Sequence, residues 1–127
     1  RLARVGRRAT WRGLELLAPT FQVQVVGTTG AGDCAIAGFL AALLRGHGPE
    51  DALTAAVGAG ACNVEAADAI SGVPTWDDLQ ARIAAGWPRL PLRIALDGWT
   101  QQIAGLWGGP HDTQPDARRS APQAMQP

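Results

Sequence analysis

Residues 27–33, Gly-Thr-Thr-Gly-Ala-Gly-Asp, constrain the fold of this chain more than any other segment. They follow residues 21–25, in which apolar and polar side chains alternate with the period of a half-buried strand. They precede an apolar stripe at helical spacing, formed by Ile36, Phe39, Leu40, Leu43 and Leu44. The sequence therefore predicts a strand, a glycine-rich turn and a helix. The unpaired N–H groups and the positive dipole end of such a helix form an anion-binding site.

Asp33 is the one acidic residue of this turn. A bound phosphate repels a neighbouring carboxylate, so a carboxylate at this position suggests a functional role. It can act as a general base that accepts the proton of a substrate hydroxyl, while the neighbouring N–H groups hold the transferring phosphoryl group. The other interpretation is an acid in the first turn of a helix, where the dipole favours it. The residues alone leave both open.

The chain from Thr28 to Leu40 resembles the second signature of the ribokinase-like (PfkB) carbohydrate kinases. The matching positions read Thr28-x-Gly30-Ala31-Gly32-Asp33-x-x-x-Ala37-Gly38-Phe39-Leu40. The resemblance implies ATP-dependent transfer of a phosphoryl group, with Mg²⁺, to the hydroxyl of a sugar or a sugar-like small molecule. It makes Gly30, Ala31 and Gly32 the anion hole over the γ-phosphate, Asp33 the catalytic base, and Thr28 a nucleotide-binding residue. The implied fold is α/β, the C-terminal part of a three-layer α/β/α domain.

The sequence departs from the family at Gly27, where relatives usually carry an acidic or polar residue. In ribokinase-like members that residue helps to bind an activating monovalent cation, K⁺, near the backbone of Thr29. Gly27 removes this charge, so the sequence leaves cation dependence open. No other set of metal ligands is predicted, since the cysteines and histidines lack ligand spacing.

Two more helices are predicted downstream. Pro49, followed by two acids, begins a helix rich in small residues, and Thr75-Trp76-Asp77-Asp78 resembles a capping box. In the family the first of these helices borders the adenine pocket, so the resemblance implies a nucleotide-binding role for Gly58 or Asn63. The residue pattern alone also fits a packed Ala/Gly helix in which Asn63 caps the helix or faces solvent.

We expect three segments. Residues 1–87 form the C-terminal part of a ribokinase-like domain, 88–107 form a covering strand and helix, and 108–127 form a disordered tail, because that stretch is polar and rich in proline. The sugar-binding Gly-Gly region of the family lies upstream of the part that the chain resembles. We therefore expect a fragment of a longer kinase, with little or no activity alone.

Composition excludes several classes of partner. Arginines and acidic residues balance at 11 each, so no net charge favours nucleic acid or a membrane surface, although five arginines cluster within residues 1–12. No apolar run is long enough to span a membrane and no signal peptide is recognisable, so we expect a soluble, cytoplasmic protein with reduced cysteines. A homodimer is left open.

Two alternatives come from other classes of protein. Gly27-x-x-Gly30-x-Gly32 has the spacing of a Rossmann-type dinucleotide site, but no strand ending in an acid follows about 20 residues later. A Walker phosphate loop is excluded because the chain contains no lysine. The second alternative is a non-catalytic remnant that acts as an interaction module through unpaired sheet edges.

Overall fold

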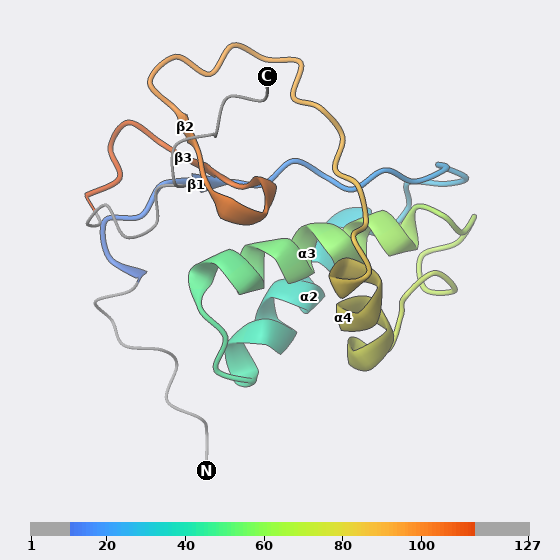
Figure 1. Cartoon of the computed structure of the whole chain (residues 1–127). Coiled ribbons are helices and arrows are strands. Elements are labelled where there is room, and N and C mark those ends of the chain that lie inside the picture. The colour runs from blue at the N-terminus through green and yellow to red at the C-terminus, as the bar shows by residue number, and fades with distance from the viewer. Residues whose placement is uncertain (1–10, 114–127) are drawn as a thin grey trace.

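The structure, a computed structural model, describes residues 11–113. Three helices pack together beneath a small sheet, and the extended segment between β1 and α2 runs between them (Figure 1). The elements, in chain order, are β1 (Leu16–Leu17), α2 (Ala31–Leu44), α3 (Pro49–Asn63), α4 (Trp76–Ala84), β2 (Thr100–Gln101), the 3₁₀ helix η1 (Ile103–Gly105) and β3 (Trp107–Gly108). This mixture of helices and sheet agrees with the predicted α/β class.

Helices α2 and α3 form the centre of the fold through small residues. Cys34, Gly38 and Ala42 are the buried residues of α2, and they recur every four positions on one face. A Cβ at Gly38 would lie 2.7 Å from the carbonyl oxygen of Ala55 and 2.8 Å from the Cβ of Ala59. The two helices can therefore approach this closely only because position 38 is a glycine.

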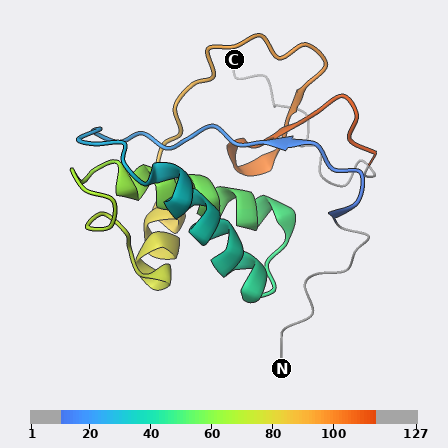
Figure 2. The same ribbon diagram turned by 180° about the vertical axis from the view of Figure 1, so that it is seen from behind.

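The prediction for the apolar face of α2 was wrong for three of its five residues, whereas Phe39 and Leu43 are partly buried and pack against the core. Ile36, Leu40 and Leu44 are 61%, 50% and 64% exposed, whereas the small residues on the other side of the helix are buried. The view from behind shows α2 in front of α3, with its outer face uncovered by any described segment (Figure 2). Close packing against α3 selects the small face of the helix, so Ile36, Leu40 and Leu44 turn away from it.

The predicted strand at residues 21–25 is also not formed. Only Phe21 makes a β-bridge, to Arg89, and the following residues run as an extended segment. Its backbone makes isolated hydrogen bonds to different segments: the N–H of Gln22 donates to the carbonyl of Pro88 (2.8 Å), and that of Val26 donates to the carbonyl of Val64 (2.8 Å). A strand needs a neighbour along its length, and the described residues provide none here.

The small sheet comes from the two ends of the described chain. Its order is β1-β3-β2, both pairs are antiparallel, and Gly108 lies opposite both Leu16 and Thr100. Residues 88–107 contain β2, the three-residue turn η1 and the first residue of β3, and no α-helix. That this segment covers the domain stays a prediction.

Residues 108–113 differ from the predicted disordered tail. Gly109 donates to the carbonyl of Glu15 (2.7 Å), His111 donates to the Glu15 carboxylate (2.9 Å), and Thr113 donates to the carbonyl of Gly13 (2.9 Å). These bonds to distant residues hold the segment despite its polar composition. The rest of the predicted tail, 114–127, and four arginines of the N-terminal cluster lie outside the described residues.

Arg89 joins the sheet to the helices. Its guanidinium donates to the carbonyls of Pro19 (2.6 Å) and Ala104 (3.1 Å) and to the hydroxyl of Thr54 on α3 (3.1 Å). It also lies 4.4 Å from the ring centroid of Phe21. Burial lowers the pKa of Arg89, a cost that these contacts offset.

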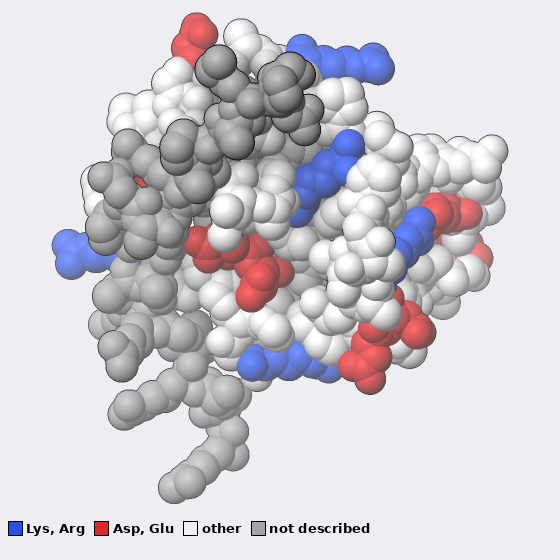
Figure 3. Space-filling view, in the orientation of Figure 1, with Lys and Arg blue, Asp and Glu red and all other residues white. Residues whose placement is uncertain are grey.

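Charges are mixed on the surface. On the face seen in Figure 3 the basic side chains are separated from one another, and acidic side chains lie beside several of them. This distribution offers no continuous basic patch on that face. Among the described residues, no helix is long and apolar enough to cross a membrane.

Candidate active site

The glycine-rich turn leads into the N-terminus of α2, where backbone N–H groups are free to bind a ligand. Gly30 is the N-cap of α2 and has φ +80°, a left-handed conformation that glycine adopts without strain. Ala31 donates to the carbonyl of Thr28 (3.3 Å), and Cys34 donates to the carbonyl of Gly30 (2.9 Å). Within residues 11–113 the N–H groups of Gly32 and Asp33 have no acceptor. These two donors, at the positive end of the helix dipole, are suited to an anion.

The two glycines that flank Ala31 serve different purposes. A Cβ at Gly30 would lie 3.0 Å from both the Cβ and the carbonyl oxygen of Ala69, so the loop after α3 presses on this turn. A Cβ at Gly32 would meet no atom within 4 Å. The space beside Gly32 is therefore open, and a ligand can reach the free N–H groups from that side.

Asp33 is exposed in the first turn of α2 and lines a cavity of about 500 Å³. The cavity lies between α2 and residues 69–79, which include the start of α4. Apart from Asp33, its walls include Ala37, Ala41, Arg45, Trp76 and Leu79. Asp33 therefore lies in the open anion-binding turn and also at the wall of a cavity large enough for a small molecule.

The loop that follows α3 is held against the turn by side chains. Asp68 accepts hydrogen bonds from the N–H groups of Ile70 and Ser71 and from the Ser71 hydroxyl, which lower the pKa of Asp68 to about 2. Asn63 is fully buried, and its side-chain amide donates to the carbonyl of Ala69 (2.8 Å). Together they fix Ala69, the residue that contacts Gly30.

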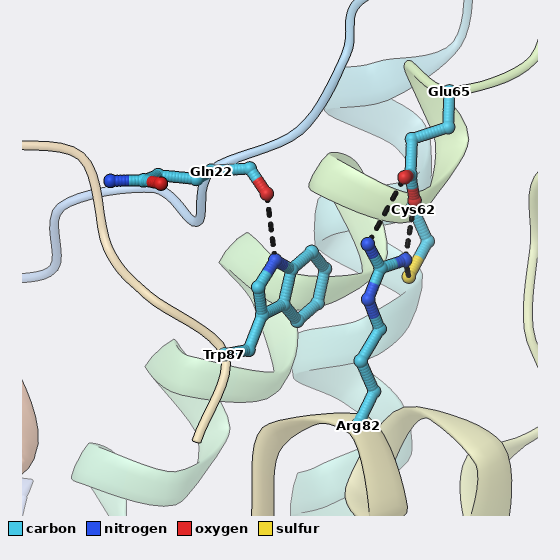
Figure 4. A network of polar contacts seen from close by, with 5 residues as sticks. All are labelled: Gln22, Cys62, Glu65, Arg82 and Trp87. Atoms are coloured by element: carbon cyan, nitrogen blue, oxygen red, sulfur yellow. Dashed lines mark hydrogen bonds and ion pairs between the residues drawn. The ribbon is translucent and has the colours of Figure 1, made fainter. Parts of the chain in front are cut away.

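A polar cluster fastens α4 to α3 (Figure 4). Arg82 forms an ion pair with Glu65, which raises the pKa of Arg82, and its guanidinium also lies 3.7 Å from the ring centroid of Trp87. The Trp87 indole donates to the carbonyl of Gln22 (2.8 Å). Arg82 also donates to the sulfur of Cys62 (3.6 Å), whose pKa is raised by burial. This cluster holds in place the helix that forms one wall of the cavity.

The structure brings some of the predicted site residues together and separates others. Thr28, Gly30, Ala31, Gly32 and Asp33 form one continuous turn. Gly58 and Asn63 do not line the cavity at Asp33. A Cβ at Gly58 would lie 2.9 Å from Leu79 and 3.6 Å from Phe21, so this glycine lies at a packed contact with α4.

Gly27 lies where no side chain fits. A Cβ there would be 2.9 Å from the carbonyl oxygen of Ala67 and 3.0 Å from that of Ala66, and the N–H of Gly27 donates to Val64 (3.2 Å). Crowding by backbone oxygens explains the glycine at this position. Within the described part of the chain, no three His, Cys, Asp or Glu side chains gather to hold a metal ion.

Sequence reasoning did not identify Arg45 or Trp76 as residues of a site. The guanidinium of Arg45 lies 4.5 Å from the ring centroid of Trp76, at the end of the cavity. The i, i+4 spacing of positions 33, 37, 41 and 45 on one helix face was the available signal.

The comparisons agree with the turn and the helices around it. The family model described as pfkB family carbohydrate kinase matches residues 11–76, more than half of the chain. The chain therefore belongs to the PfkB family of carbohydrate kinases, and the predicted resemblance is confirmed. The matched residues, which include α2 and α3, form part of an α/β, ribokinase-like domain.

A solved structure, the crystal structure of ribokinase from Thermotoga maritima, matches with 36% sequence identity and a TM-score of 0.49. The match covers 52% of this chain and 22% of the ribokinase chain. The chain thus spans less than a quarter of that relative's length. No match was found among curated proteins.

Proposed function

We propose that this chain supplies the general base and the phosphate-binding backbone of an ATP-dependent kinase whose acceptor is the hydroxyl of a sugar or sugar-like molecule. Membership of the PfkB family supports the reaction class. The observation that carries the proposal is the position of Asp33, beside the unpaired N–H groups of α2 and at the wall of a cavity.

In the proposed reaction, Asp33 accepts the proton of the acceptor hydroxyl as its oxygen bonds to the γ-phosphorus of ATP. The bond to the β-γ bridging oxygen breaks, and ADP leaves. The N–H groups of Gly32 and Asp33 stabilise the negative charge on the transferring phosphoryl oxygens, because they are already oriented before the reaction. Among the described residues no three His, Cys, Asp or Glu side chains gather, so no side chain of this chain is assigned to Mg²⁺.

The test needs the base within a whole kinase domain. A chimera in which residues 11–76 replace the matching segment of the Thermotoga maritima ribokinase supplies the rest of that domain. We expect sugar-dependent ADP release from the chimera. The Asp33→Asn variant should lower kcat by about 10²–10⁴-fold, while the Kd for ATP changes little, since only the base is removed.

The matched control is Asp51→Asn. Asp51 is an exposed acid on α3 that pairs with His47 (3.6 Å), away from the turn, and its variant should retain the kcat of the chimera. An Asp33→Asn chimera with undiminished kcat would contradict the proposal. Titration with NAD⁺ in place of ATP tests the dinucleotide alternative, for which only NAD⁺ should bind.

A further inference from the structure

The cavity extends well beyond Asp33 along α2. Asp33, Ala37, Ala41 and Arg45 all line it, and because they are four residues apart they lie along one side of the helix. The first and last of these positions are separated by about 18 Å, at about 1.5 Å per residue. The far end of this α2–α4 groove, around Arg45 and Trp76, is thus remote from the transferring phosphoryl group.

At this far end lies the guanidinium of Arg45, several of whose N–H donors make no hydrogen bond within residues 11–113. One of its donors bonds to the carbonyl of Ala41 (3.1 Å), and its guanidinium lies over the Trp76 ring. A guanidinium has five N–H donors, and Arg45 makes no ion pair within residues 11–113. By contrast, Arg82 is paired with Glu65, and Arg89 donates to three separate acceptors.

Two acidic groups near this end, Asp51 and Asp78, have other partners. Asp51 forms an ion pair with His47, whose ring lies 5.4 Å from that of Trp76. The carboxylate of Asp78, in the first turn of α4, accepts a hydrogen bond from the Thr75 hydroxyl (2.7 Å), and the Asp78 N–H donates to the oxygen of that hydroxyl (3.2 Å). Arg45 is the only basic side chain among the residues that line the groove, so it is the one to which an anion bound there can pair.

The middle of the groove is lined by small and apolar residues. Ala37 and Ala41 form the α2 wall with small methyl groups, and Val73 and Leu79 stand on the opposite wall. Such walls leave room for a flat hydrophobic body. The volume of about 500 Å³ is in the range of sites for small organic molecules.

We propose that the α2–α4 groove binds an aromatic organic anion, with its acid group on Arg45 and its ring system between Ala41 and the Val73–Leu79 wall. This site goes beyond the phosphoryl transfer proposed above and does not depend on it. The pairing of a guanidinium with an acid provides orientation, and burial of the ring against the alanine wall provides affinity.

The probe is 8-anilinonaphthalene-1-sulfonate, an aromatic anion whose fluorescence rises on binding, titrated into the purified 127-residue chain. We expect saturable binding, a Kd raised at least about tenfold by Arg45→Gln, and loss of binding in Ala41→Phe, which fills the groove. The neutral analogue N-phenyl-1-naphthylamine should bind wild type and Arg45→Gln with Kd values within about twofold of each other, because it has no acid group.

The matched control is Leu40→Ser on the outer face of α2. This residue is 50% exposed and lies with Ile36 and Leu44 on the exposed apolar face of α2, the competing surface for the probe. Its variant should keep the wild-type Kd within about twofold. An unchanged Kd in Arg45→Gln, or loss of binding in Leu40→Ser, would overturn the proposal. Arg45 is exposed, so its variant is expected to fold, and circular dichroism checks this. No nucleotide is present, so failure here is independent of the kinase proposal.

Discussion

Two glycines of α2 serve different purposes: Gly32 belongs to the anion-binding turn, and Gly38 allows α2 and α3 to pack closely. Gly32 and Gly38 lie in the same helix, and both have backbone angles that alanine can adopt. They differ in what a Cβ would meet, because Gly32 faces open space and Gly38 faces α3. The same substitution to alanine should therefore have opposite effects on the free energy of unfolding.

The magnitudes follow from these surroundings. At Gly32 the added methyl contacts nothing within 4 Å, so the gain in helix propensity remains, and the free energy of unfolding should rise by about 0.5–1 kcal/mol. At Gly38 the methyl would lie 2.7 Å from the Ala55 carbonyl oxygen, and α2 and α3 would have to separate. Overpacking of this kind costs about 1–3 kcal/mol, which exceeds the propensity gain of up to about 1 kcal/mol.

Gly32→Ala should stabilise the fold but weaken the binding of ATP. The Gly32→Ala methyl takes up the space through which a phosphate oxygen would approach the N–H groups, so the Kd for ATP should rise by about tenfold or more. Urea denaturation measures the free energies of unfolding, and isothermal titration with ATP measures the Kd. A destabilised Gly32→Ala chain, or one that binds ATP like wild type, would refute the assignment of this open space to a phosphate. A fully stable Gly38→Ala chain would refute the close helix contact.

Two further predictions concern residues that hold the structure around the site. Arg89→Lys should lower the free energy of unfolding by about 1–3 kcal/mol, because one ammonium cannot reach three separated acceptors, and urea denaturation should show little difference from Arg89→Met. For Asp68, the folded-state pKa of about 2 lies below the ordinary value of 3.8, so its stabilising effect is present above about pH 4 and is lost as the pH falls toward 2. Thermal unfolding should therefore show a lower Tm for Asp68→Asn at pH 5 and the same Tm as wild type near pH 2; a constant difference would count against this role.

Local sequence was sufficient for the helices and for the turn. Gly30 precedes α2, Pro49 begins α3 and Thr75 caps α4, as the residue types predict, because capping and turn formation depend on neighbours in the chain. The predicted strand at residues 21–25 failed for the opposite reason. An alternating pattern shows that a strand is compatible with the residues, but the hydrogen bonds come from another segment.

The sequence by itself determined that a glycine turn places Asp33 at the start of a helix, and the pattern of the turn was enough to indicate the PfkB family. Only the tertiary structure decided which face of α2 is buried, because α3 packs against Gly38 and leaves Ile36, Leu40 and Leu44 exposed. It also decided that Arg45 meets Trp76, 31 positions away in the chain, at the end of the same cavity as Asp33. Contacts of this kind depend on how helices pack, and no local pattern specifies them.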